Sequence, residues 1–164
     1  MGALEADLEL IEEAMSRFFQ AMKRPQAWTR ITERAGVQID RPAAGILHAL
    51  MLYHGNQGCH LNDLAAQLSI EAPSVTRKTQ ELEQAGLIRR RRDPQDGRAV
   101  DLQLTARGRQ VSRKLWDARR AGVHEILASW PASDRQRFVK LFDRFSQDIN
   151  MYYQTERRNH VSQR

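Results

Sequence analysis

Four polar residues in one short stretch, Ser74, Thr76, Arg77 and Gln80, could recognise the bases of a nucleic acid. Arginine and glutamine can each form paired hydrogen bonds with a base edge, and serine and threonine can reach either a base or a phosphate. A solvated helix face can have the same composition. The interpretation therefore depends on the elements that position these side chains and on what surrounds them.

Two short helices joined by a tight turn are predicted around this stretch. Residues 61–68 carry apolar side chains at helical spacing, and Asn62 is the expected N-cap. A second helix is expected to begin at Ala72–Pro73, because proline is tolerated in a first turn, and to end at Gly86. This order of elements is a helix-turn-helix.

The second helix has one apolar face and one polar face. Its predicted buried residues are Val75, Thr79 and Leu82. Because these residues recur at steps of four and three positions, Arg77 and Gln80 must lie on the opposite face.

A basic β-hairpin is predicted after this helix. The run Arg89–Arg92 precedes an Asp-Gly turn signal, and apolar and polar residues then alternate over residues 100–104. Such a ribbon suits a phosphate backbone, and Arg98 at its tip suits a narrow minor groove. Strand alternation turns about half of the four arginines away from DNA, and the sequence leaves open which ones touch phosphate. Arg90 and Arg91 are the candidates for contact with phosphate.

These features together resemble the MarR family of bacterial winged helix-turn-helix regulators. The matching residues lie in the family's order: Leu64-Ala65, Leu68, Pro73-Ser74, Arg77, the run Leu82–Arg90, the run Asp93–Arg98 and the run Leu104–Gly108. The resemblance implies a mainly α-helical fold with a small β-wing. It places the winged helix-turn-helix in residues 40–104 and adds a short strand near Cys59–Leu61, which completes a three-stranded sheet.

The resemblance also assigns roles to individual residues. Ser74 and Arg77 are expected to face the major groove, and Arg98 is expected to approach the minor groove. An acidic residue at the base of the wing can orient that arginine, or can hold it in a salt bridge that stiffens the turn. The residues expected to support the wing are Asp93, Asp96 and Gly97.

The charge of the chain favours a polyanionic partner. The net charge is +6, and residues 86–120 carry eleven Lys or Arg against four acids, whereas residues 1–16 carry five acids and no base. No apolar run approaches the ~20 residues needed to span a bilayer, and the acidic start is unlike a signal peptide. With a single cysteine, we expect a cytoplasmic protein without a membrane partner.

Amphipathic helices are predicted before the winged region. Residues 4–23 carry an apolar stripe, Pro25 should kink or break that helix, and helical spacing resumes over residues 28–35 until Gly36. Asp40 is the expected N-cap of the next helix, with Pro42 in its first turn and Gly55 as its stop. Its predicted buried side consists of Ile46, Leu47, Leu50, Met51 and Tyr53.

Two long helices are predicted after the wing. Thr105 is the expected N-cap of the first, Pro131 interrupts it, and Ser133–Gln136 fits a capping box for the last helix. The apolar stripe of that last helix consists of Phe138, Leu141, Phe142, Phe145, Ile149 and Tyr152. The polar tail beyond Gln154 is expected to fray.

A single domain over residues 1–164 is expected, with residues 4–36 and 105–154 as dimerisation helices. Left exposed, their large apolar residues would form a patch above the few hundred Å² that soluble monomers usually tolerate. A homodimer buries this surface and holds two DNA-reading helices about 34 to 36 Å apart, one turn of duplex. This geometry predicts a palindromic operator.

No metal site or cofactor is expected. His48, His54, Cys59 and His60 are potential metal ligands, but their spacing matches no familiar zinc pattern. A regulator that responds to a metal or to oxidation of Cys59 is kept as an alternative. No nucleophile elbow, phosphate-binding glycine loop or paired carboxylates occur in a motif context, so an enzyme is not expected.

A small-molecule effector is implied by the resemblance, since members of the family often bind aromatic or phenolic anions between the dimer helices and the winged region. Met51, His48, Trp28 and Arg119 are candidates for lining such a pocket, but their spacing does not single out ligand residues. The sequence thus favours a ligand-responsive, dimeric, DNA-binding repressor. The alternative class is an architectural protein that coats double-stranded DNA without sequence preference.

Overall fold

The structure is a computed structural model that describes residues 3–55, 58–92 and 100–161. The chain divides into two compact units, Met1–Gly122 and Val123–Arg164, and each is described by itself. None of the helices in these described ranges is both long and apolar enough to cross a membrane.

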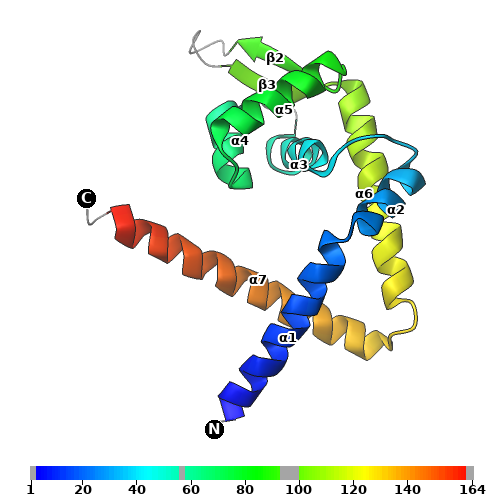
Figure 1. The fold of residues 1–164 in the computed structure, drawn as a ribbon, viewed down its shortest axis with the longest axis vertical. Helices are drawn as coiled ribbons and strands as arrows, with labels where there is room; N and C mark the ends of the chain where they lie inside the picture. The colour runs from blue at the N-terminus through cyan, green and yellow to red at the C-terminus, as the bar shows by residue number, and fades with distance from the viewer. Residues whose placement is uncertain (1–2, 56–57, 93–99, 162–164) are drawn as a thin grey trace. The chain divides into compact units, whose positions relative to one another are not determined.

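The first unit contains the predicted winged helix-turn-helix. Its elements in chain order are α3 (Arg41–Ala49), η1 (Leu50–His54), β1 (Cys59–His60), α4 (Leu61–Leu68), α5 (Ala72–Gln84), β2 (Ile88–Arg92) and β3 (Val100–Leu104). The strands form an antiparallel sheet in the order β1-β3-β2, and Cys59 pairs with Leu102. Figure 1 shows α5 next to the β2–β3 hairpin. The mainly helical fold with a small three-stranded wing is therefore confirmed.

One hydrophobic core holds these elements together. Its most deeply buried members come from η1 and all the helices and strands of this region: Ile46, Leu47, Leu50, Cys59, Leu64, Val75, Ile88 and Leu102. Thr79 is also fully buried, and its hydroxyl donates a hydrogen bond to the carbonyl of Thr76. The predicted apolar face of α5 is therefore confirmed.

The ends of α5 follow from its sequence. Pro73 lies in the first turn, where its missing N–H costs no intrahelical hydrogen bond. The carbonyl of Glu71 accepts hydrogen bonds from the N–H groups of Ser74 and Val75. At the other end the helix stops at Gln84, and Gly86 adopts a left-handed φ of 67° that favours glycine.

The predicted cap of α4 is wrong. The helix begins at Leu61, and His60 occupies the N-cap position without a side-chain capping bond. Asn62 therefore lies inside the first turn instead of preceding it. The extended backbone of His60 also belongs to β1, so pairing of the wing sheet determines where α4 starts.

The predicted cap of α3 is confirmed, but one buried residue is not. The side chain of Asp40 accepts a hydrogen bond from the N–H of Ala43 at 2.8 Å. After Ala49 the helix continues to Gly55 as the π-helix η1. A π-turn holds more residues than an α-turn, which changes the faces that follow. Tyr53, predicted to be buried, is 64% exposed.

The flanking helices agree with the predicted breaks. Helix α1 covers Ala3–Lys23, α2 covers Pro25–Ala35, and the chain bends at Arg24 between them. Helix α6 covers Ala106–Leu127, and the hydroxyl of Thr105 caps it by accepting a hydrogen bond from the N–H of Gly108 at 3.0 Å.

The last helix, α7, covers Ala132–Val161 and corrects two predictions. It begins before Ser133, because the carbonyl of Pro131 already accepts hydrogen bonds from the N–H groups of Asp134 and Arg135. The hydroxyl of Ser133 contacts Asp134 instead, so no capping box forms. The backbone stays helical beyond Gln154, where fraying was expected.

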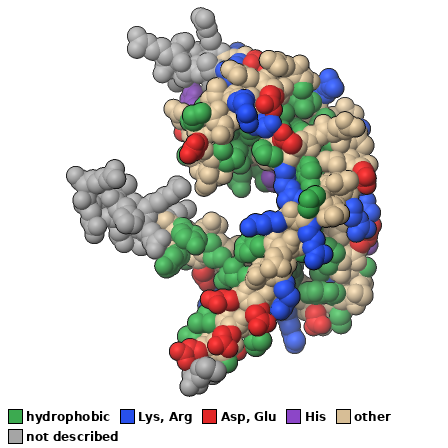
Figure 2. Space-filling view, in the orientation of Figure 1, with side chains coloured by type: hydrophobic (Ala, Val, Ile, Leu, Met, Phe, Trp, Pro, Cys, Tyr) green, Lys and Arg blue, Asp and Glu red, His purple; other side chains and the backbone are tan. Residues whose placement is uncertain are grey.

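Large apolar residues are exposed on α1 and on α7. Those on α1 include Leu4, Leu8, Leu10, Ile11, Phe18 and Phe19. Those on α7 include Phe138, Val139, Leu141, Phe142, Phe145, Met151, Tyr152 and Tyr153. Figure 2 shows hydrophobic side chains in green at the surface of these helices. Each helix thus has an apolar face that its own unit does not bury.

Candidate nucleic-acid interface and cavity

Helix α5 presents a polar face to solvent. Ser74, Arg77 and Gln80 are all exposed, and the Arg77 side chain is 76% exposed. Thr76 is half-buried, and its hydroxyl donates to the carbonyl of Ala72 at 2.8 Å. Because the opposite face of α5 is packed into the core, the helix holds Ser74, Arg77 and Gln80 on its solvent-facing side.

Lys78 ties α5 to the start of α3. Its ammonium group donates to Oδ2 of Asp40 and to Oε2 of Glu81, both at 2.5 Å. Glu81 also lies 3.9 Å from Arg77. Burial disfavours the charged form of Asp40, but hydrogen bonds from Lys78 and the Ala43 N–H, with the nearby positive charges, still lower its pKa. The hydrogen bond to Asp40 is the main reason why the pKa of Lys78 is raised.

Arg90 braces α5 against the wing. Its guanidinium donates to the hydroxyl of Thr79 at 3.2 Å. Its Nε lies 3.0 Å from Oε2 of Glu83, in an ion pair whose N–H is not aligned for a hydrogen bond. The predicted contact of Arg90 with phosphate stays a prediction, since this guanidinium already has two partners on α5.

The neighbouring wing arginines are more exposed. Arg89 donates two hydrogen bonds to Oε1 of Gln103, at 3.2 and 2.9 Å. The Arg91 side chain is exposed and makes no hydrogen bond or ion pair with any other residue that the structure describes. Arg91 is thus available to phosphate. Four predicted site residues lie outside the described ranges: Asp93, Asp96, Gly97 and Arg98.

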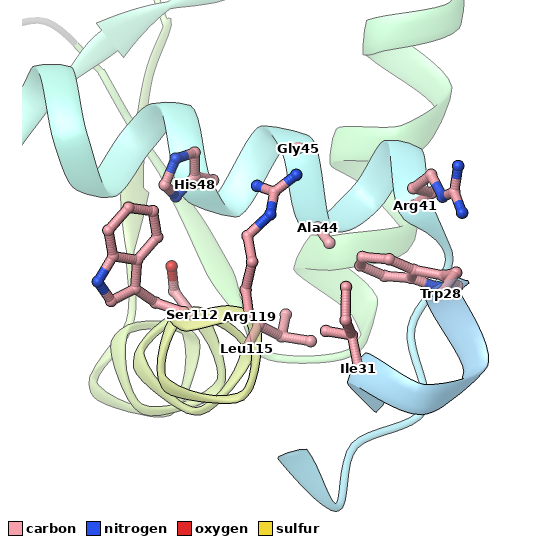
Figure 3. A pocket seen from close by; sticks show the side chains of 10 residues that line it. Trp28, Ile31, Arg41, Ala44, Gly45, His48, Ser112, Leu115 and Arg119 are labelled. Atoms are coloured by element: carbon pink, nitrogen blue, oxygen red, sulfur yellow. The ribbon is translucent and has the colours of Figure 1, made fainter. Parts of the chain in front are cut away.

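A cavity of about 210 Å³ lies within the first unit, between α2, α3 and α6 (Figure 3). Its lining includes Trp28, His48 and Arg119, three of the four residues proposed from the sequence. Arg119 extends from α6 toward α3, between His48 and Trp28 (Figure 3). The fourth candidate, Met51, lines a separate cavity instead.

The cavity combines aromatic walls with positive charge. The ring of His48 stacks on Trp116 at 5.1 Å between centroids, and the guanidinium of Arg41 lies 5.7 Å from the ring centre of Trp28. Burial, and then the charge of Arg119, lowers the pKa of His48. Arg41 and Arg119 supply the positive charge of the cavity lining. An apolar site with a few polar groups is typical of small-molecule binding.

The metal and thiol alternatives gain no support. Among the described residues, no three His, Cys, Asp or Glu side chains are grouped so as to hold a metal ion. Cys59 is buried, and burial, aided by the charges of Asp63 and Asp101, raises its pKa to about 11. A neutral, buried thiol is a poor nucleophile.

Sequence reasoning missed the pairing of Lys78 with Asp40, which the sequence predicts only as an N-cap, and it missed the contacts of Arg41. Lys78 and Asp40 are separated by 38 positions, and no local pattern connects them. Arg41 follows an N-cap, so its partners in α1 are set by tertiary packing. Of these residues, only Lys78 has a weak signal of function in the sequence, since it is a second positive charge next to Arg77.

Known proteins resemble the chain in sequence and in fold. The MarR family model matches residues 46–100. The chain is 30% identical over 100 residues to YdgJ, an uncharacterized HTH-type transcriptional regulator of Bacillus subtilis, covering 61% of this chain and 60% of YdgJ. It is 33% identical over 94 residues to BilQ, an HTH-type transcriptional regulator of Clostridioides difficile, covering 57% of this chain and 58% of BilQ. The chain thus spans about three fifths of the length of both relatives.

Solved structures share the fold across most of the chain. A MarR family protein from Bacillus stearothermophilus superposes with a TM-score of 0.79 and 17% identity, over 92% of this chain and 99% of its own. The PcaV transcriptional regulator of Streptomyces coelicolor, in complex with its natural ligand, has a TM-score of 0.58 and 24% identity, over 81% and 89%. YdgJ and BilQ, which the chain matches in sequence, are both described as transcriptional regulators. The winged region of the chain thus matches the MarR family model, and the fold of the chain is similar to that of solved MarR family structures.

Proposed function

We propose that the chain is a cytoplasmic, homodimeric transcription regulator that reads a palindromic operator in double-stranded DNA. The observation that carries the proposal is α5, which buries Val75, Thr79 and Leu82 and exposes Ser74, Arg77 and Gln80. In this proposal Arg77, with Ser74, Thr76 and Gln80, contacts base edges or phosphates in the major groove. Arg90 and Arg91 contact phosphate, and Arg90 also braces the wing against α5. Arg98 approaches the minor groove with support from Asp93, Asp96 and Gly97.

The proposed dimer uses the exposed apolar faces of α1 and α7. These faces carry phenylalanine, leucine and tyrosine residues that are between 40% and 70% exposed in the isolated chain. Apolar surface of this extent usually marks an interface in soluble proteins. A two-fold pairing would present two copies of α5 to successive turns of one duplex.

The proposed effector is a small aromatic or phenolic anion bound in the cavity that Trp28 and Arg119 line. The tryptophan rings can stack on an aromatic ligand, and the guanidinium of Arg119 can pair with a carboxylate or phenolate. PcaV, which shares the fold, was solved with its natural ligand. We assign the chain as a repressor whose DNA affinity falls when the effector binds, which requires the effector to prefer the weaker-binding form.

Replacing Arg77 by alanine tests the proposed base reading. The substitution should cost about 1 to 3 kcal/mol of binding free energy on the preferred duplex and flatten the preference at one base position. The measurement is fluorescence anisotropy on the preferred duplex and on single-base variants of it, at constant salt. Lys114→Ala removes the same charge from an exposed position on α6 and serves as the control. Equal weakening by Arg77→Ala on every duplex would assign Arg77 to phosphate and contradict base reading.

A further inference from the structure

Three consecutive residues, Ile39, Asp40 and Arg41, connect α5 to the cavity and to α1; we call them the junction segment. The carbonyl of Ile39 accepts a hydrogen bond from the indole Nε1 of Trp28 at 3.0 Å. Asp40 accepts from the Lys78 ammonium at 2.5 Å and also caps α3. Each of these two residues therefore binds a side chain from a different helix.

Arg41, the third residue of the segment, holds the end of α1. Its Nη1 donates to the carbonyl of Met22 at 2.8 Å, and its Nη2 donates to the carbonyl of Arg24 at 3.3 Å. Arg41 makes no hydrogen bond or ion pair with α5 in the part of the chain that the structure describes. Any effect of Arg41 on α5 must therefore pass through its neighbours in the segment.

The cavity borders the junction segment directly. Arg41 and Trp28 both line the cavity, and in Figure 3 they lie side by side at its end away from His48. A bound anion would compete with the Met22 and Arg24 carbonyls for the guanidinium of Arg41. Arg41 is bonded covalently to Asp40, and Trp28 donates a hydrogen bond to Ile39, the other covalent neighbour of Asp40. A change at Arg41 or at Trp28 can therefore move Asp40.

Lys78 is the residue of α5 that binds Asp40 of the junction segment. Its side chain is only 18% exposed, and its ammonium is held by two carboxylates, so it is not free to bind phosphate. The same Glu81 that binds Lys78 lies 3.9 Å from Arg77. Lys78 therefore links α5 to Asp40 at the start of α3, and it also binds the carboxylate that lies beside Arg77, the proposed base-reading residue.

We propose that Lys78 is a positioning residue for α5, and that the junction segment couples occupancy of the cavity to the position of α5. The inference rests on the proposed function, because only a DNA-reading α5 gives the coupling a regulatory meaning. In the structure Arg41 donates hydrogen bonds to the Met22 and Arg24 carbonyls, and Asp40 binds Lys78, which holds α5 against α3. An anion that draws Arg41 away loosens this arrangement and lowers DNA affinity.

Amide hydrogen exchange of the full chain, followed by mass spectrometry, tests the coupling without DNA or effector. Lys78→Met and Arg41→Met should each make the amides of α5 exchange about tenfold faster, as expected when hydrogen bonds from a charged donor that limit local opening are lost. Lys114→Met and Arg30→Met remove the same charges from exposed positions and should leave α5 unchanged. No change in α5 for either test variant would overturn the proposal. An equal rise in every helix would show general destabilisation and would also overturn it.

Asp40→Asn tests the route. Asparagine remains a good N-cap, so α3 keeps its cap while Lys78 loses the charge of Asp40 and keeps its ion pair with Glu81. In this background Arg41→Met should no longer accelerate exchange in α5. If it still does, the coupling does not pass through Asp40 and the proposed route is wrong.

Operator binding separates this inference from the proposed function. If the wild-type chain prefers an operator and Lys78→Met weakens that preference, both stand. If the wild-type chain shows no operator preference, the proposed function fails, while the exchange results still decide the physical coupling. If the wild type prefers its operator but the exchange of α5 is insensitive to Arg41, the coupling alone is overturned.

Discussion

Replacing Gly108 by alanine should destabilise the fold by about 3 kcal/mol or more, because overpacking against backbone cannot be relieved by a rotamer change. A Cβ at this position would lie 1.9 Å from the carbonyl oxygen of Leu87 and 2.9 Å from its carbonyl carbon. That carbonyl also accepts a hydrogen bond from the N–H of Thr105 at 3.0 Å. The new methyl group would have to push α6 away from the chain that enters the wing.

The loss should be visible in urea denaturation of the full chain, as a lower midpoint with an unchanged slope. Gly122→Ala is the matched control, since it lies on the same helix and a Cβ there meets nothing within 4 Å. Because alanine favours helix, that variant should be neutral or more stable by up to about 1 kcal/mol. Equal midpoints for Gly108→Ala and the wild type would show that this helix–wing contact is not rigid.

Replacing Leu141 by glutamate should dissociate the proposed homodimer and weaken operator binding by about 10²- to 10⁴-fold, because two linked winged regions bind DNA more tightly than one. Leu141 is 67% exposed in the isolated chain, so the substitution removes little that stabilises the subunit itself. In a dimer it would place an unpaired carboxylate in an apolar interface, which is costly.

Sedimentation velocity measures the dissociation, and anisotropy on the operator measures its effect on binding. Gln136→Glu adds the same single negative charge to an exposed position of α7 and should leave both readings unchanged. A wild-type chain that sediments as a monomer at micromolar concentration would contradict the dimer. So would a Leu141→Glu variant that keeps the wild-type size and affinity.

Local patterns in the sequence predicted the elements of the winged region well. The steps between Val75, Thr79 and Leu82 depend only on helix geometry, and all three residues are buried. Asp40 and Thr105 were predicted as caps because a capping side chain binds the backbone within its own turn.

The predictions that failed depend on contacts outside the local sequence. The π-turn of η1 exposes Tyr53, and nothing in the helical spacing before it distinguishes an α-turn from a π-turn. Asn62 and Ser133 are good capping residues by type, but β1 and Pro131 set where α4 and α7 begin. Short-range preference was therefore overridden by neighbouring elements.

The candidate sites show the same division. Exposure of Arg77 and Gln80 follows from the periodicity of α5, and it is seen in the structure. The pairing of Lys78 with Asp40 spans 38 positions and requires the packing of α5 on α3. Trp28 was a candidate for lining the cavity because of its residue type. Only the fold shows which side chains line the same cavity.

One binding measurement tests most directly whether a homodimer of this chain reads a specific DNA sequence. The full chain is titrated into a palindromic duplex taken from the DNA beside its own gene and into a shuffled duplex of equal length and composition. At about 0.15 M salt the account predicts that the palindrome binds about 10³-fold tighter or more. Equal midpoints on the two duplexes would contradict it and would favour a protein that coats DNA without regard to sequence.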